Sequence, residues 1–295
     1  MTMLEDSSIQ KGAQPRMIDC HNHILADIDD GAVDMGMSLA MAKVSVDCGV
    51  SDVVVTPHHG NGAFENFAQT VRQEMQNLQM ELIKHKLPLR LHLGSELHLT
   101  AEMNGQIERG EVLTYANKGK AALIELPKSH LPAGIEALLG RCLDQGVTPL
   151  IAHPERNSEL ARQPEKFVEW VEWGCRGQLT ALSVSGYFGE KIQAACDYWI
   201  TNKSAHVVAS DAHRPKGRSP NLLKAYHYVA DHYGTEIASV LFYTNPQHLI
   251  TGQPLITLPT VSNRSANLLH REGTKSNQQQ KAKQPSLFAR LFGKQ

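Results

Sequence analysis

The sequence lacks any long apolar run. No stretch of about 18 apolar residues occurs in the chain, so no transmembrane helix is expected. Residues 1–16 are polar and have no apolar core, so they do not resemble a secretory signal. We therefore expect no stable membrane insertion, and a cytoplasmic location.

Cysteine is scarce, and its placement argues against several chemistries. The five cysteines are scattered without a CxxC pair, which is typical of reduced thiols in the cytoplasm. No cysteine is followed by arginine at the spacing that a cysteine-dependent phosphatase needs. A P-loop and a GxSxG motif are also absent, so a P-loop nucleotide enzyme and a serine-nucleophile hydrolase are both disfavoured.

Excess charge of one sign is missing as well. The formal net charge of −1 predicts no general affinity for nucleic acid or for a membrane surface. The charge is unevenly distributed, however. Residues 262–295 carry a net charge of +6, which leaves −7 on residues 1–261. The acidic body argues further against a nucleic-acid substrate.

Short apolar segments alternate with amphipathic segments between residues 17 and 261. Helices are expected at residues 35–48, 65–86, 135–145 and 167–173. Strands are expected at residues 17–20, 52–56, 89–94, 121–126, 147–152, 179–184 and 205–209. This alternation predicts parallel βα units in an α/β fold. Seven such units favour a closed, irregular barrel over an open sheet.

The chain divides into three parts by composition. Residues 1–16 are predicted to be a disordered N-terminal segment, and residues 17–261 a single catalytic domain. Residues 262–295 form a polar, basic tail that is predicted to be mostly disordered. At its end, Leu287, Phe288, Leu291 and Phe292 fall on one face of a short helix. This face is either a loosely packed end or a docking motif for a protein partner.

Six of the seven expected strands carry a histidine or an acidic residue at or just beyond their C-terminal ends. In chain order these are His21, His23, Asp27, Asp29 and Asp30; His58 and His59; Glu96; Glu125; His153, with Arg156 nearby; and Asp211 and His213. In α/β barrels this edge is where active sites form. The pattern therefore predicts a single site.

Imidazole and carboxylate side chains without cysteine are suited to Zn, Mn, Fe or Co. In an extended segment, His21 and His23 point to the same side, and so do Asp211 and His213. Each motif alone is weak evidence, and Glu125 could equally be a buried ion-pair partner. Their repetition at equivalent strand ends predicts a site for two or three metal ions, and Glu96 is able to bridge two of them.

Six sequence motifs resemble those of the PHP superfamily. They are MIDCHNHILADIDDGA, VVVTPHHGNGAFEN, LGSELHL, ALIELP, GVTPLIAHPER and VVASDAH followed by Arg218. They are still more similar to the CpsB/CapC/YwqE-like tyrosine phosphatases of bacterial capsule and exopolysaccharide operons. The motifs occur in family order over residues 17–245. The resemblance implies an irregular seven-stranded parallel (β/α) barrel of PHP type.

The resemblance also implies three metal ions, with Mn²⁺ first and Fe, Co or Zn as alternatives. The first ion would be held by His21, His23, Glu96 and Asp211; the second by Glu96, Glu125 and His153; and the third by Asp30, His58 and His213. Arg156 and Arg218 match the two arginines that bind the substrate phosphate. The resemblance favours His58 over His59 and Asp30 over Asp29, and the sixth strand receives no ligand.

The function implied is metal-dependent hydrolysis of phosphotyrosine, on a protein such as a bacterial tyrosine autokinase that controls capsule or exopolysaccharide synthesis. Hydrolysis would be direct, without a covalent enzyme intermediate. The general acid is not identified, and His59 and Asp27 are the candidates. Two alternatives remain open: a PHP phosphoesterase for a small phosphate ester, and a non-enzymatic metal-bound regulatory protein. The paired arginines disfavour the second.

Overall fold

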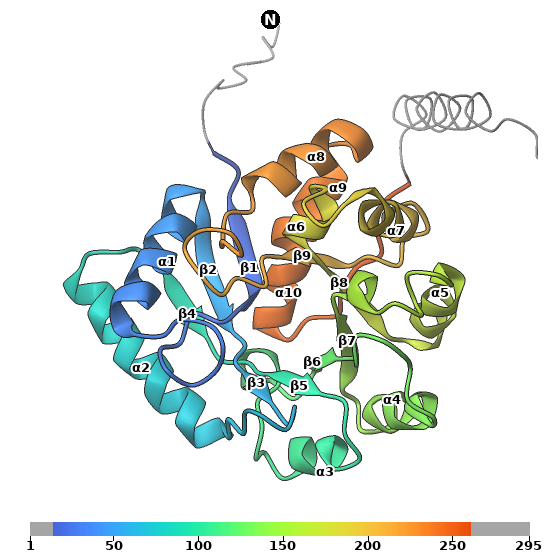
Figure 1. Ribbon diagram of the computed structural model, residues 1–295, viewed down its shortest axis with the longest axis horizontal. Helices are drawn as coiled ribbons and strands as arrows, with labels where there is room; N and C mark the ends of the chain where they lie inside the picture. Colours follow the sequence, from blue (N-terminus) through green and yellow to red (C-terminus); the bar gives the residue numbers. More distant parts are fainter. Residues whose placement is uncertain (1–13, 261–295) are drawn as a thin grey trace, which may run out of the picture.

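The computed structural model describes residues 14–260, in which helices surround centrally placed strands (Figure 1). The strands are β1 (Met17–Asn22), β2 (Val50–Val55), β3 (His58–His59), β4 (Arg90–His92), β5 (Glu96–His98), β6 (Ala121–Glu125), β7 (Thr148–Ala152), β8 (Arg176–Thr180) and β9 (Val207–Ala209). The longer helices are α1 (Met35–Asp47), α2 (Ala68–Lys84), α4 (Ile135–Asp144), α5 (Pro164–Trp173), α7 (Glu190–Thr201) and α8 (Leu223–Tyr233).

Shorter helical segments complete the chain. They are α3 (Met103–Glu108), η1 (Tyr115–Asn117), η2 (Pro154–Arg156), α6 (Ala181–Val184), α9 (Thr235–Ser239), η3 (Val240–Thr244) and α10 (Asn245–Thr251). Within residues 14–260, no helix has both the length and the apolar character needed to cross a bilayer. The predicted segments at residues 1–16 and 262–295, including the apolar face of the tail, lie outside the described residues apart from residues 14–16.

The strands form two parallel sheets, with orders β1-β2-β4 and β3-β5-β6-β7-β8-β9. The α/β fold of parallel strands is therefore confirmed, whereas one closed seven-stranded barrel is not. The strands expected at residues 52–56 and 89–94 are observed as β2 and β4, and two short strands that were not expected follow them, β3 after Pro57 and β5 after Gly94. Proline has no N–H for a ladder hydrogen bond, which explains why β2 and β3 are separate.

The first and last strands nevertheless meet. An isolated parallel bridge joins Asn22 to Ala212, just beyond the end of β9. The His23 amide donates to Ala212 O at 2.9 Å, and the Asp211 amide donates to His21 O at 2.8 Å. These bonds place the segment after β9 beside the end of β1.

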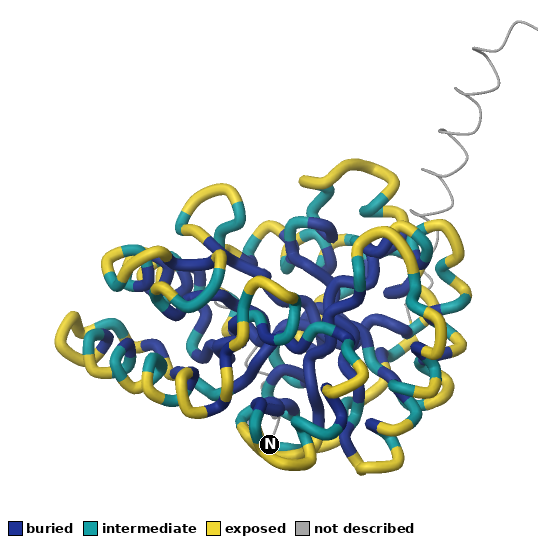
Figure 2. The backbone as a smooth tube through the Cα atoms, turned by 60° about the horizontal axis from the view of Figure 1, so that its bottom comes forward, coloured by how far each residue is buried: buried dark blue, intermediate teal, exposed yellow. Residues whose placement is uncertain are grey.

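One strand prediction is wrong in its second half. The sixth strand, expected at residues 179–184, ends at Thr180 as β8, and Ala181–Val184 forms helix α6. Both halves are apolar and buried, and a short buried helix cannot be distinguished from a buried strand by hydrophobicity alone. Buried segments gather in the middle of the molecule (Figure 2), and β1 and β6 are buried at every residue. The apolar run Ala121–Ile124 of β6 has this physical origin.

His206 lies just before β9 and is almost fully buried. Burial, assisted by the positive charge of Arg176, lowers its pKa to about 3. In the unfolded chain a histidine takes up its proton near pH 6.5. The folded pKa is the lower one, so the neutral side chain contributes stability above about pH 6.5, and this contribution is lost as the pH falls towards 3.

The variant His206→Gln should therefore be less sensitive to acid than the parent. When the pH is lowered from 6.5 to 5, the free energy of unfolding of the parent should fall further than that of the variant. The difference between the two should reach up to about 2 kcal/mol, because glutamine takes up no proton. Urea unfolding at both pH values measures this difference. His227→Gln, at an exposed histidine of α8, should keep the parental dependence. An identical pH dependence in His206→Gln and the parent would contradict the assignment.

Candidate metal centre

All nine residues predicted as metal ligands lie together at one end of the strands. They fall into four overlapping groups, in each of which one nitrogen or oxygen atom per residue lies within 4.8 Å of the others. The groups are His23, Asp30, His58 and His213; His21, His23 and Glu96; His21, His153 and Asp211; and His58, Glu96 and Glu125.

Two histidines from the end of β1 form the first part of the centre. The Nε2 atoms of His21 and His23 lie 3.2 Å apart, and each is 3.3 Å from Glu96 Oε2. Asp211 Oδ1 approaches the same two nitrogens at 3.5 and 3.3 Å. The geometry therefore brings together the four side chains expected to hold the first ion.

Glu96, at the start of β5, is fully buried in the middle of the centre. Its Oε1 lies 2.9 Å from His153 Nε2, and its Oε2 lies 3.0 Å from His58 Nδ1. Glu125 Oε2 is 3.7 Å from the same His58 nitrogen. Glu96 therefore faces residues of all three expected ligand sets, which is the position that a bridging carboxylate requires.

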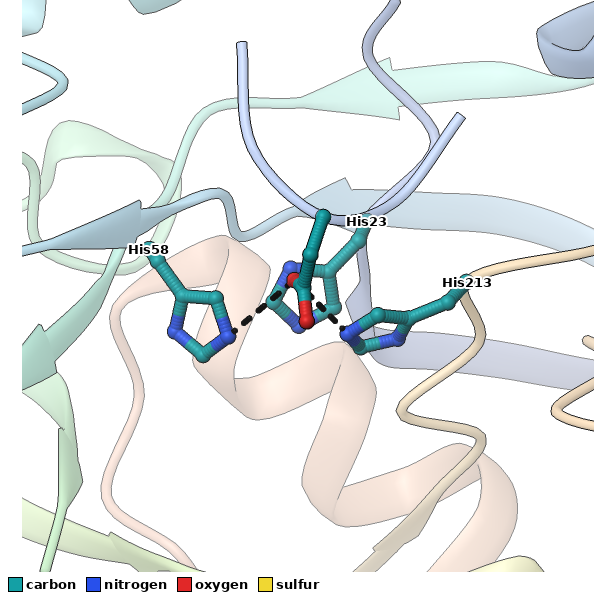
Figure 3. Close-up of side chains that lie close together, drawn as sticks. His23, His58 and His213 are labelled. Carbon is teal, nitrogen blue, oxygen red and sulfur yellow. Dashed lines mark ion pairs between the residues drawn. The ribbon is translucent and has the colours of Figure 1, made fainter. Parts of the chain in front are cut away.

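The third part of the centre lies at its mouth. Asp30 Oδ1 is 3.1 Å from His213 Nε2 and 3.5 Å from His58 Nε2, and the Asp30 side chain is half exposed. The rings of His23, His58 and His213 point toward one another from separate segments (Figure 3). His23 belongs to this group by distance, although it was expected with the first ion.

Two residues outside the predicted ligand set orient His21 and His23. Asp29 Oδ2 accepts from His23 Nδ1 at 2.7 Å, and Gln178 Oε1 lies 2.8 Å from His21 Nδ1. Both contacts leave the Nε2 atoms facing the centre, as is usual for metal-binding histidines. Asp29 was among the candidates from the sequence but was set aside in favour of Asp30, whereas its contact with His23 gives it a supporting role. Gln178 lies on β8, the strand to which no ligand was assigned.

Backbone conformation also fixes two candidate ligands. His153 and Asp211 have positive φ angles of 31° and 50°, which residues other than glycine rarely adopt. The His153 carbonyl accepts from the Arg156 amide at 2.9 Å, and the Asp211 amide donates to His21 O at 2.8 Å. Local strain held in this way is common at functional sites.

The centre gathers groups that compete for protons away from water. Burial opposes the charge on His23, but Asp29, Asp211 and Glu96 outweigh this and raise its pKa well above the ordinary value. Burial likewise opposes the charge on Glu96, but the histidines around it, led by His21 and His58, hold its pKa well below the usual range. A bound cation would replace these protons as the partner of the carboxylates.

Several buried atoms in the centre have no hydrogen-bond partner within the protein. They are Glu96 Oε2, His58 Nδ1 and His213 Nε2. The first two are 3.0 Å apart but are not aligned for a hydrogen bond. Convergent nitrogen and oxygen atoms without hydrogen bonds fit divalent metal ions, so the residues present are suited to the predicted cofactor.

Arg156 and Arg218 meet at the opposite oxygen of Asp211. Arg156 Nη1 and Arg218 Nη2 both donate to Asp211 Oδ2, the second at 2.7 Å, while Oδ1 faces the histidines. Both guanidinium groups are partly exposed. Asp211 therefore contacts both the histidines of the centre and the two arginines at the rim of the centre.

The two candidates for a general acid, His59 and Asp27, are in none of the four groups. His59 is buried, and its ring packs edge-on against Phe67 with centroids 4.9 Å apart. Its Nε2 lies 3.6 Å from Glu65 Oε2. The proton donor therefore stays unassigned.

Comparisons with known proteins agree with this architecture. The sequence profile described as "Capsular polysaccharide synthesis, CpsB/CapC" matches residues 17–251. Tyrosine-protein phosphatase YwqE of Bacillus subtilis is 35% identical over 243 residues, which is 82% of this chain and 95% of that protein. Tyrosine-protein phosphatase CpsB of Streptococcus pneumoniae is 33% identical over 244 residues, which is 80% of this chain and 99% of that protein.

A solved structure is similar over nearly the same region. It is one of the crystal structures of YwqE from Bacillus subtilis and CpsB from Streptococcus pneumoniae, described as metal-dependent tyrosine phosphatases. The TM-score is 0.79 at 33% sequence identity, covering 84% of this chain and 100% of that chain.

Gly31 offers a test of how the centre is supported. A Cβ atom at Gly31 would lie 2.2 Å from His23 O and 2.5 Å from His23 Cβ, so Gly31→Ala must displace the loop that carries Asp29 and Asp30. We expect Mn²⁺ affinity to fall about 10- to 100-fold. Titration calorimetry on metal-stripped protein measures it.

The matched control is Gly140→Ala in α4, where an added Cβ meets no atom within 4 Å. It should keep the parental Mn²⁺ affinity. Circular dichroism would verify that both variants are folded. Parental affinity in folded Gly31→Ala would show that the loop does not position the ligands.

Proposed function

Since the chain belongs to the CpsB/CapC family of capsular polysaccharide synthesis, we propose that it is a metal-dependent tyrosine-protein phosphatase. One observation carries the proposal: nine histidine and carboxylate side chains converge, and two arginines at the rim of this cluster both donate to Asp211. The substrate class comes from the relatives, which are named tyrosine-protein phosphatases.

The proposal includes three metal ions, with Mn²⁺ first and Fe, Co or Zn as alternatives. The first would be held by His21, His23, Glu96 and Asp211; the second by Glu96, Glu125 and His153; and the third by Asp30, His58 and His213. The short distances between these donors support the assignment, as does the central position of Glu96. The irregular barrel is part of the same proposal, supported by the bridge between Asn22 and Ala212.

Bound ions would lower the pKa of water and neutralise charge on the phosphoryl oxygens. The chain's own residues prepare the site for that chemistry. Asp29 and Gln178 fix the rings of His23 and His21. Asp211 anchors Arg156 and Arg218 through one nitrogen each, and the remaining guanidinium N–H groups are free to bind phosphoryl oxygens. A tyrosine leaving group, with a pKa near ~10, needs little help from a general acid.

We propose a phosphotyrosine protein as the substrate, specifically a bacterial tyrosine autokinase that controls capsule or exopolysaccharide synthesis in the cytoplasm. The family's role in capsular polysaccharide synthesis supports this choice. Docking through the tail at residues 262–295 is part of the same hypothesis, and that segment lies outside the described residues.

Metal dependence is the direct test. Chelation should abolish hydrolysis of a phosphotyrosine peptide, and added Mn²⁺ should restore it best, because the donors need a cation as their partner. Glu96→Gln should stay inactive with Mn²⁺ present, since it loses a charge that faces three ligand sets. Glu136→Gln, on the exposed side of α4, is the control and should match the parent. Full activity of protein shown to be metal-free by elemental analysis would refute the proposal.

The arginines should be separable from the metal ligands. Arg156→Ala and Arg218→Ala should retain Mn²⁺ but lose about 2–4 kcal/mol of transition-state stabilisation each, which is roughly a 30- to 1,000-fold drop in kcat/KM. Arg214→Ala is the matched control, because Arg214 is exposed in the same loop as Arg218. Turnover at the parental rate by either variant would remove that arginine from the phosphate site.

A further inference from the structure

Two aromatic side chains stand exposed between α6 and α7. The side chains of Tyr187 and Phe188, which we call the aromatic tip, are 62% and 37% exposed. Their rings pack edge to face against each other, with centroids 5.3 Å apart. Exposed aromatic rings forgo the favourable free energy of burying their apolar surface, so an adjacent pair of them is a candidate site for binding a ligand.

The backbone holds the aromatic tip in a defined turn. The Tyr187 amide donates to Leu182 O at 2.9 Å, and the Gly189 amide donates to Gly186 O at 3.2 Å. Gly186 and Gly189 flank the pair with φ angles of 80° and 96°, which favour glycine. Gln193 Nε2 donates to Val184 O at 3.0 Å and ties α7 to the start of this turn. The exposure is therefore built into the fold and does not result from fraying.

The aromatic tip lies directly beside the proposed phosphate site. The guanidinium carbon of Arg156 is 6.0 Å from the centroid of the Phe188 ring, and the same guanidinium binds Asp211. Phe188 and Arg156 line a cavity of about 340 Å³, whose apolar wall is completed by Ala161 and Ile192. Lys128 also lines it. The cavity thus has charged side chains, Arg156 and Lys128 with Glu155, next to the aromatic ring of Phe188.

We propose that the aromatic tip binds the aryl ring of the substrate, with Phe188 as the residue that distinguishes aryl from alkyl phosphates. The inference rests on the proposed function. A phosphoryl group held by Arg156 leaves its ester substituent within reach of Phe188, and aromatic rings pair with centroids about 4.5–7 Å apart. An alkyl phosphate makes the same phosphoryl contacts but has no ring to pair.

Phe64 is an alternative aromatic residue next to the centre. Its ring stacks on His58 at 6.2 Å and 9°, and its side chain is partly buried. That face is already paired with a candidate ligand, whereas the aromatic tip has faces open to solvent. The observations therefore favour Phe188.

Binding of two non-hydrolysable phosphonates to the Mn²⁺-loaded protein tests the proposal. The parent should bind benzylphosphonate more tightly than methylphosphonate. In Phe188→Ala the preference should fall about three- to tenfold, the size of one aromatic pair, with methylphosphonate affinity unchanged. The kcat/KM ratio for phenyl phosphate over methyl phosphate should fall by the same factor, mainly through KM. Tyr198→Ala, at an equally exposed aromatic of α7 (37%), is the matched control and should retain both ratios.

Several results would overturn the inference. These are an unchanged phosphonate preference in Phe188→Ala, an equal loss for both phosphonates, and loss of the preference in Phe64→Ala alone. A change of oligomeric state in Phe188→Ala, with the preference intact, would make the aromatic tip an interface between copies of the chain.

The two proposals fail in distinguishable ways. A parent that hydrolyses neither phosphate, yet shows a benzylphosphonate preference that depends on Phe188, would refute the phosphatase and support aryl binding by the tip. A parent that hydrolyses both phosphates, with a ratio independent of Phe188, would refute only the role of the tip.

Discussion

The structure of the centre depends on one buried carboxylate. Glu96 is removed from water, and the nitrogens of His21, His23, His58 and His153 lie within 3.3 Å of its oxygens. A charge in such surroundings is tolerated only with partners of opposite charge. The four histidines come from three separate strand ends, so satisfying Glu96 requires those strands to end at the same place. The burial of the Glu96 charge and the alignment of these strand ends therefore depend on each other.

The arrangement of the strands meets this constraint. Parallel strands carry their C-terminal ends to one edge, and the contact between β1 and the segment after β9 brings His21 and Asp211 together. Positive φ angles at His153 and Asp211 then turn these two residues where their strands end. The Asp29 and Gln178 contacts set the ring orientations last. Fold, backbone and side-chain contacts thus act at successively finer scales.

The sequence predicted which residues meet, but not how each is held. Strand periodicity and the position of polar residues at strand ends predicted one shared metal site, and the family resemblance selected the nine candidate ligands within it. Alternation led to a choice between Asp29 and Asp30, whereas the structure places both at the centre in different positions: Asp29 on His23 and Asp30 at the mouth. Gln178 could not be found from local sequence, because its contact with His21 joins residues far apart in the chain. The helix at Ala181–Val184 was not predicted, because its apolar residues are equally compatible with a buried strand.

The contact between the first and last strands has a consequence for the timing of biosynthesis. Asn22 is paired with Ala212, so the segment that completes the centre is made about 190 residues after the one that begins it. At roughly 5–20 residues per second, a ribosome needs about 10–40 s to cover that distance. Throughout this interval His21 and His23 have no Asp211 to meet, and the apolar edge of β1 has no neighbour on that side. A nascent chain therefore has to keep its first strand soluble until almost the whole domain has emerged, and the part of the centre that includes Asp211 and His213 is completed only after the last strand has been made.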